Sequence, residues 1–332
     1  MRFHIGYQNE QQFKKFILDH SDQLSELYFP WETFTTGRGV SNSRELQEKM
    51  ESDLAEFSRA GIDLCLLLNG NCYGSASLSR SFFQRLGDTV DHIREKFNLR
   101  SVTTASPLIA KFLHKNFPGL HLQASVNMEI GTPEGVEYIL DYFDSFYLKR
   151  EYNYKMDAIV RMRDFCHSYD KKLFLLANSG CLNYCSARTF HDNLVAHQHE
   201  ISEMDNAFVF QGICSTFLEN PENREGILSK SNFIRPEDIP LYEELCDGIK
   251  LATRTNHNPA AVTMAYFTGA WHGNLLDLTE PAHSEWFLPK IIANRLIPEE
   301  YAHKRFRCSG ICEKCGYCKE IQKNATIQLS DN

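Results

Sequence analysis

Residues 172–185 read KLFLLANSGCLNYC: an apolar run, then small and polar residues, then two cysteines spaced Cys-x3-Cys. A short apolar run bounded by polar residues is typical of a buried strand in a parallel sheet. The Asn, Ser and Gly that follow mark a loop. The stretch therefore predicts a strand that delivers Cys181 and Cys185 to its carboxyl end.

Similar apolar runs recur along the chain, and amphipathic segments with helical periodicity separate several of them, at 154–169, 240–246 and 259–267. The other expected strands are 3–7, 24–31, 63–70, 101–106, 120–126, 144–150, 206–212, 232–238 and 248–254. Strands alternating with helices at a spacing of about 20–30 residues favour an α/β fold of the (β/α)8 TIM-barrel type. A doubly wound open sheet is the alternative, but no G-x-G-x-x-G follows the first strand, which disfavours dinucleotide binding.

The 332 residues contain no Pro- or Gly-rich linker, so we predict a single barrel-like domain over 1–300. A short cysteine-rich appendage over 301–322 is expected to bind a metal or cluster, and 323–332 is expected to be a disordered tail. The chain shows neither a signal peptide nor an apolar run long enough for a membrane span, which predicts a cytoplasmic protein with no membrane partner.

The formal net charge of −8 disfavours a general nucleic-acid binder. A local basic patch, formed by Lys304, Arg305 and Arg307, lies beside the last cysteines, and we interpret it as a solvated surface. A small-molecule or protein substrate is therefore favoured over RNA, which stays possible.

Eleven cysteines are many for a protein of a reducing compartment, where disulfides are rare. Grouped cysteines are then expected to be metal ligands or reactive thiols. Cys65, Cys72 and Cys166 stand alone, and the apolar surroundings of Cys65 and Cys166 predict core positions.

The internal cysteines follow expected strand ends. Cys181 and Cys185 come after 172–178, and Cys214 comes after 206–212. Barrel enzymes build their active sites from the loops at the carboxyl ends of the strands. We therefore expect these three thiols to meet at the barrel mouth as cluster ligands; three unrelated buried cysteines are the alternative.

The C-terminal cysteines have the spacing Cys308-x3-Cys312-x2-Cys315-x2-Cys318. Three cysteines separated by pairs of residues form the ligand run of bacterial cubane ferredoxins, which predicts a 4Fe-4S cluster. Zinc is the competing metal for such a thiol set. The first three cysteines also match the radical S-adenosylmethionine spacing, but their place at the end of the chain disfavours that chemistry. With Cys246 as an eighth thiol, either one shared cluster or two clusters are possible.

Other candidate chemistry is sparse. Arg150 and Glu151 follow an expected strand and are predicted as an anion clamp and an acid or base, with a structural ion pair as the alternative. His197 and His199 form a His-x-His pair that we assign to a solvated helix surface. The chain has no H-E-x-x-H or G-x-S-x-G, and no Cys–His pair with a role is evident.

The order of several segments resembles the collagenase-like peptidase family U32. The segments are HLQASVN (121–127), YLKREYN with Arg150 and Glu151, KLFLLANSGCLNYC, NFIRPEDIPLYEEL (232–245), and GIKLATR with Lys250 and Arg254. The resemblance spans roughly Leu64 to Phe267, which is most of the chain.

The resemblance implies a barrel-like catalytic domain with a 4Fe-4S cluster held by Cys181, Cys185 and Cys214. It also implies oxygen-independent hydroxylation of tRNA, ribosomal RNA or a ubiquinone precursor, supported by an electron donor or a homologous partner subunit. This chain departs from the family in the short Cys181–Cys185 spacing and in having Pro240 after Ile239, where the family's last ligand follows. The tail cysteines are then expected to replace that ligand or to hold a second cluster.

Three functions follow from these observations. The first is an iron–sulfur redox enzyme that acts on a small molecule or RNA. The second is a U32-type peptidase, and the third is a non-catalytic accessory protein with a structural metal site.

Overall fold

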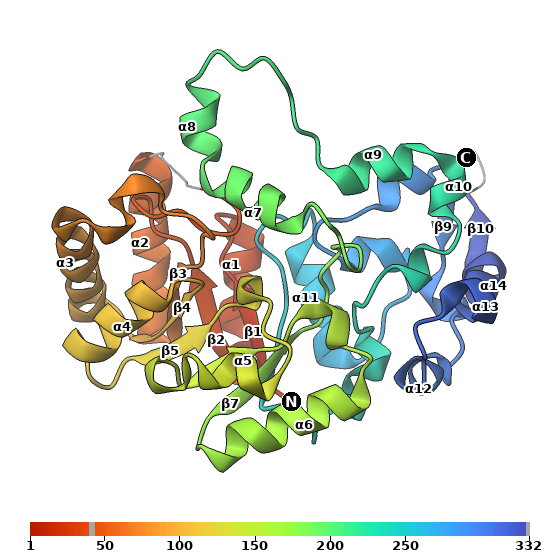
Figure 1. The fold of residues 1–332 in the computed structure, drawn as a ribbon, viewed down its shortest axis with the longest axis horizontal. Coiled ribbons are helices and arrows are strands. Elements are labelled where there is room, and N and C mark those ends of the chain that lie inside the picture. Colours follow the sequence, from red (N-terminus) through yellow and green to blue (C-terminus); the bar gives the residue numbers. More distant parts are fainter. Residues whose placement is uncertain (40–43, 330–332) are drawn as a thin grey trace.

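The computed structural model describes residues 1–39 and 44–329 and contains a closed barrel of eight parallel strands (Figure 1). Each strand pairs with its neighbour in chain order, and the last pairs with the first through Phe3–Ile249 and His4–Lys250. The strands are β1 (Phe3–Gly6), β2 (Leu24–Phe29), β3 (Leu64–Leu68), β4 (Leu99–Thr104), β5 (His121–Ala124), β6 (Ser145–Tyr147), β7 (Lys172–Leu176) and β8 (Gly248–Lys250). The predicted (β/α)8 fold is confirmed.

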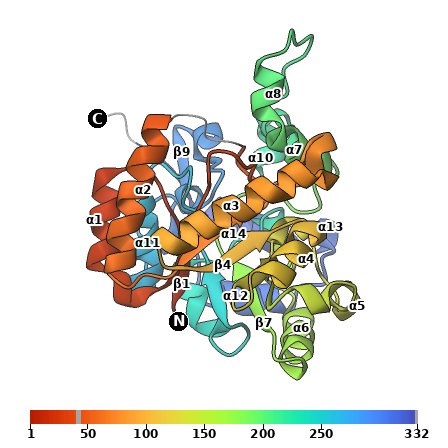
Figure 2. The same cartoon turned by 90° about the vertical axis from the view of Figure 1, so that its left-hand side faces the viewer.

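Helices surround the barrel, as Figures 1 and 2 show. The larger ones are α1 (Gln11–Asp19), α2 (Arg44–Arg59), α3 (Arg80–Lys96), α4 (Pro107–Asn116), α6 (Met156–Ser168) and α11 (Pro259–Thr268). Helix α3 shows how the sequence sets the start and the buried face of such a helix. The Ser79 hydroxyl caps its start by accepting a hydrogen bond from the Phe82 amide at 3.1 Å. Phe82, Leu86, Val90 and Ile93 then bury one face at helical spacing.

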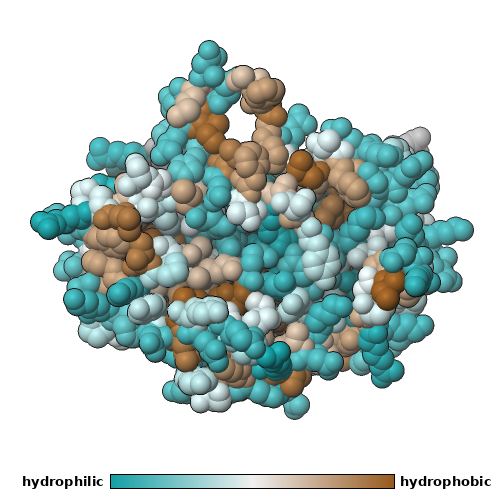
Figure 3. Space-filling model, viewed as in Figure 1, coloured by the Kyte–Doolittle hydropathy of each residue, from teal (hydrophilic) through white to brown (hydrophobic). Residues whose placement is uncertain are grey.

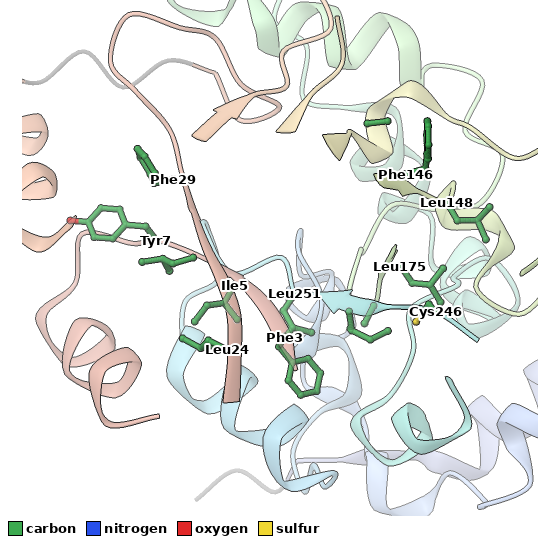
Figure 4. Packing of buried hydrophobic residues seen from close by; sticks show 14 of the residues in the cluster. Phe3, Ile5, Tyr7, Leu24, Phe29, Phe146, Leu148, Leu175, Cys246 and Leu251 are labelled. Atoms are coloured by element: carbon green, nitrogen blue, oxygen red, sulfur yellow. The ribbon is translucent and has the colours of Figure 1, made fainter. Parts of the chain in front are cut away.

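Apolar side chains fill the space between strands and helices (Figure 4). Ile5 of β1, Phe29 of β2 and Leu175 of β7 are completely buried. Burial of each such side chain contributes about 1.5–3 kcal/mol. Cys246 lies in this same core, and Cys65 and Cys166 are buried as predicted.

Two expected strands are wrong. Residues 206–212 extend away from the body of the protein, and Phe208 is 91% exposed. Residues 232–238 instead run into a 3-10 helix (Pro236–Tyr242), which also replaces the first half of the helix expected at 240–246. The physical reason is that the barrel is already closed by its eight strands. Because β7 pairs directly with β8, the barrel has no vacant edge for a further strand.

The C-terminal segment is more ordered than predicted. After α12 (Tyr301–Phe306) and α13 (Cys312–Cys315), helix α14 (Tyr317–Ala325) leads into β10 (Thr326–Gln328), which pairs with β9 (Lys290–Ile292). The expectation of disorder from residue 323 is therefore wrong as far as Gln328, because completely buried Ala325 and Ile292 join this segment to the core. Residues 330–332 lie outside the described residues, and the predicted domain boundaries stay predictions.

No helix in the described parts of the chain has the length and apolar character needed to cross a membrane.

A buried polar network fills the barrel interior. The Glu26 carboxylate accepts hydrogen bonds from Ser101 at 2.8 Å and from the Gln123 amide at 2.7 Å, and it lies 3.2 Å from His4 Nδ1. Burial acts against ionisation of Glu26, but His4 and Lys250 outweigh it and lower its pKa to about 2. The interior is therefore held by an ionised carboxylate.

We predict that Glu26→Gln lowers the free energy of unfolding by on the order of 3 kcal/mol at pH 7, because it replaces the ionised acceptor of two buried donors, Ser101 and Gln123, with a neutral amide. A carboxyl group with a depressed folded-state pKa stabilises the fold above its unfolded pKa and loses that effect as pH falls towards about 2. Urea unfolding between pH 7 and pH 3 should therefore show a loss of stability in the wild type that is smaller in Glu26→Gln. The same change at exposed Glu219 is the control, and equal stability of the two variants would contradict the prediction.

Candidate active site

A cavity opens at the carboxyl ends of the barrel strands, where β/α barrels place their chemistry. Side chains from most of the strand ends line it, and four are cationic. The lining residues with polar side chains are Tyr28, Arg38, Asn69, Ser125, Asn127, Tyr147, Arg150, Lys250, Arg254 and Glu280. The mouth therefore combines an excess of positive charge with two buried tyrosines.

Two of the four cations are neutralised. The Arg38 Nε atom donates to the Glu280 carboxylate at 3.0 Å. Arg150 donates to Glu129 at 2.8 Å and to the Asn127 side chain at 2.7 Å. These pairs fix both guanidinium groups at the rim and leave them little net charge.

The other two cations, Lys250 and Arg254, form no ion pair with any carboxylate among the described residues. Lys250 Nζ lies 3.8 Å from the Tyr28 ring centroid, a cation–π contact. Burial lowers the pKa of Lys250, and burial together with Arg38 lowers the pKa of Arg254 to about 10. Arg254 remains charged at neutral pH, and neither group has a carboxylate ion-pair partner among the described residues, so the cavity favours an anionic ligand.

Of the two predicted catalytic residues, Arg150 lines this cavity, whereas Glu151 lies behind it. The Glu151 carboxylate is buried and lies 2.5 Å from Arg188 Nη1. Burial opposes its ionisation, but the charge of Arg188 outweighs burial and lowers the pKa of Glu151. This geometry fits an ion pair of the barrel rim, and catalytic roles for the two residues stay predictions.

Arg188 begins α7 (Arg188–Ala196) and secures the cysteine loop that precedes it. It donates to the Leu182 carbonyl at 3.2 Å and contacts the Glu129 carboxylate at 3.0 Å. The Tyr184 amide donates to Glu151 at 3.4 Å. These bonds hold the segment from Cys181 to Cys185 against the mouth.

Cys214 comes within electrostatic range of Cys181 and Cys185, although by a different route from the one expected. Cys214 lies in α9 (Ile213–Glu219) rather than after a strand. Burial raises the pKa of its thiol, and negative charge on Cys181 and Cys185 raises it further.

The tail cysteines form a second group that extends from the loop after α12 to the first turn of α14. Burial raises the pKa of Cys318 against the opposing charge of Arg305, and the thiols of Cys308, Cys312 and Cys315 add to the rise. Cys312 and Cys315 are exposed. Cys246 belongs to neither group, because it packs in the core, where burial raises its pKa to about 12.

A small cavity lies between the internal cysteine loop and the tail cysteines. Asn183 and Tyr184 of the internal loop line it together with Cys308, Cys312 and Cys318. Hydrogen bonds to residues 230–232 position both sides of this cavity. The Asn183 amide donates to the Lys230 carbonyl at 2.7 Å, and buried Arg305 donates to the Asn232 side chain at 2.7 Å.

Within residues 1–39 and 44–329, no three side chains of His, Cys, Asp or Glu are arranged to hold a metal ion. The fold brings together two sets of cysteines, but cluster binding would require their side chains to rotate towards a common centre. As a donor set, seven cysteines suit iron–sulfur clusters or zinc.

Sequence reasoning missed a Cys–His contact. The side chains of Cys72, in the loop after β3, and His197, at the end of α7, lie close enough for each to shift the pKa of the other. Glu200 binds the other side of the ring, with its Oε2 atom 2.7 Å from His197 Nδ1. The two segments lie far apart in the sequence, so no spacing pattern in the sequence predicts this Cys–His pair.

No known family model matches the chain. The uncharacterized protease MJ1657 of Methanocaldococcus jannaschii is 25% identical over 271 residues, which cover 78% of this chain and 76% of that protein. The structure of the U32 peptidase Mk0906 aligns with a TM-score of 0.56 and 15% identity, over 76% of this chain and 92% of that one. The first comparison relates the sequences over most of both proteins, and the second relates the folds.

We predict that Arg188→Gln lowers the free energy of unfolding by about 3–5 kcal/mol, because it leaves the buried Glu151 carboxylate without its cation. Chemical denaturation measures this loss. Arg161→Gln is a matched control, since Arg161 pairs with Glu134 at 2.8 Å on the exposed surface and should cost less than about 1 kcal/mol. Similar losses in both variants would show that Arg188 does not anchor the loop.

Proposed function

We propose that this chain is a member of the U32 peptidase family and an iron–sulfur redox enzyme with an anionic substrate; its similarity to an uncharacterized protease and its fold likeness to a U32 peptidase support the membership. The observation that carries the proposal is the gathering of seven cysteines beside a cation-lined barrel mouth. The reaction it suits is an oxygen-independent hydroxylation or a related modification, as the sequence resemblance implies.

The thiol sets have the chemistry that a cluster requires. Cys181, Cys185 and Cys214 would hold a cluster at the mouth, and Cys308, Cys312, Cys315 and Cys318 would hold a second one or complete the first. A bound 4Fe-4S cluster supplies single-electron transfer. The adjacent position of the two sets across one small cavity supports transfer between them or a shared site.

The chain's own residues would bind and orient the substrate. Lys250 and Arg254 attract an anionic group, since no carboxylate neutralises them among the described residues. Tyr28 and Tyr147 form apolar walls with polar tips beside Lys250 Nζ, at 3.8 and 5.1 Å from their ring centroids. Arg38 and Arg150, already paired, shape the rim.

Anaerobically purified protein is expected to contain iron and acid-labile sulfide, about four irons for a shared cluster and about eight for two. Cys181→Ser and Cys315→Ser should each lower the iron content, because each removes a thiolate ligand. The control is Cys166→Ser, which changes a core cysteine. Stoichiometric zinc without sulfide, or iron unchanged in Cys181→Ser, would contradict the proposal.

Anion binding at the mouth is testable without knowing the substrate. Inorganic phosphate and succinate are expected to raise the thermal unfolding temperature of the wild type, since a ligand that binds the folded state stabilises it. Lys250→Met and Arg254→Gln should abolish that rise. Lys115→Gln, at an exposed site, is the control, and an unchanged response in both mouth variants would contradict the assignment.

A further inference from the structure

Cys72 lies at the edge of the barrel mouth but belongs to neither cysteine group. It follows Asn69, which lines the mouth cavity, in the loop between β3 and α3. Its thiol is half-buried and accepts a hydrogen bond from the Gly74 amide at 3.4 Å. The His197 ring lies over the same loop, with its Cε1 atom 3.5 Å from the position of a Cβ atom on Gly74.

Three side chains form a chain of contacts at this place. Glu200 holds His197 Nδ1 at 2.7 Å, which leaves Nε2 for the Cys72 thiol. The hydrogen bond from His197 is the main cause that lowers the pKa of Cys72, and the Gly74 amide adds to it. In return, Cys72 and then Glu200 raise the pKa of His197. Both shifts favour a thiolate–imidazolium pair.

The scaffold that brings these segments together is specific. Thr35, in the loop after β2, donates its hydroxyl to the Ala196 carbonyl at 2.8 Å, next to His197. The same threonine packs against Gly70, where a Cβ atom would come within 2.5 Å of its methyl group. Thr35 thus joins the end of α7 to the loop that carries Cys72, and glycine at position 70 permits the close approach.

We propose that Cys72, His197 and Glu200 form a nucleophilic site that accepts acyl groups from amides or esters. This arrangement has the roles of a thiol nucleophile, a base that activates it and a carboxylate that orients the base. It differs from the proposed iron–sulfur function in its residues and its chemistry, and it requires no cluster.

The proposed reaction consumes only the acyl donor and water. Cys72 Sγ attacks the carbonyl carbon, and collapse of the tetrahedral adduct breaks the bond to the leaving amine or alcohol. Protonated His197 gives that leaving group its proton, and an acyl thioester remains on Cys72. A water molecule then attacks the thioester with His197 as base, which releases a carboxylic acid and restores the thiol.

An apolar surface beside the site suits the acyl side of such a substrate. Phe190 of α7 is 59% exposed and lies seven residues before His197, so the two are on the same side of the helix. Phe210, from the segment that follows α8 (Gln198–Ser202), packs against Phe190 with ring centroids 5.4 Å apart. Figure 3 shows apolar residues gathered on this arch of the chain, above the body of the protein. An acyl group with an apolar side chain is therefore the favoured donor.

p-Nitrophenyl hexanoate tests the proposal on the intact, cluster-loaded protein. At pH 7 we expect a burst of about one p-nitrophenolate per chain, with peptide mapping by mass spectrometry placing the hexanoyl group on Cys72. Cys72→Ser should lose the burst and keep its iron content, which separates this site from the cluster sites.

The partner variants test whether the pair is functional. His197→Gln should slow acylation of Cys72 at least about tenfold at pH 7 and far less at pH 9.5, where the thiol ionises unaided. His199→Gln, an exposed position two residues away, is the matched control and should behave as the wild type. A further measurement needs no variant: the rate at which iodoacetamide alkylates Cys72 in the wild type is followed as a function of pH. The midpoint of this pH profile should lie below the usual pKa of a thiol.

Hexanoyl label only on exposed Cys312 or Cys315, or a His197→Gln rate equal to that of the wild type at every pH, would overturn the proposal.

Discussion

The hydrogen bonds that close the barrel, from β8 back to β1, are the constraint on which the site depends. Since all eight strands run parallel, closure places the carboxyl ends of all of them around one mouth. The side chains of Tyr28 and Arg254 then face each other across β1. Gly6 makes this possible, because a Cβ atom there would lie 2.6 Å from both side chains. The cationic mouth is thus a direct consequence of how the strands close.

Charge is arranged in two layers along the barrel. Inside lies the ionised Glu26 with His4, and above it lies Lys250, whose charge contributes to the low pKa of that carboxyl group. The inner layer is satisfied by hydrogen bonds from Ser101 and Gln123. The outer layer is not, since Lys250 and Arg254 have no carboxylate partner among the described residues. An imbalance of this kind costs stability, and proteins retain it where a ligand supplies the missing charge.

Most of the barrel was predictable because each strand carries its own local signal. An apolar run such as LCLLL is buried on both faces, and its length and polar ends mark it without any knowledge of its neighbours. Residues 206–212 carry the same signal and are not a strand, because strand formation also requires a free edge, which closure removes. The ordered tail was missed for the converse reason: its sequence is polar, and its few buried contacts, such as Ala325, are tertiary.

The site residues likewise divide into those with a local sequence signal and those placed only by tertiary contacts. Cys181 and Cys185 follow a strand, as predicted, whereas Lys250 and Arg254 appeared only within a stretch of the sequence resemblance and were not predicted as site residues. Cys214 was expected near the other two through a strand that does not exist, and it reaches them on α9 instead. The Cys72–His197 contact gave no local signal at all, because it depends on Thr35 joining two distant loops. Contacts between loops are set by the assembled fold, and sequence spacing does not encode them.

Helix α7 connects the two proposed sites. Arg188 at its start anchors the loop of Cys181 and Cys185, and His197 at its end faces Cys72. Nine residues of helix separate them by roughly 13 Å at 1.5 Å per residue. Cysteines bound to iron cannot act as free nucleophiles, so a chain with both a cluster and acyl-transfer chemistry needs a thiol outside the ligand sets. Cys72 satisfies that condition, and the helix that positions its histidine also fixes the cysteine loop.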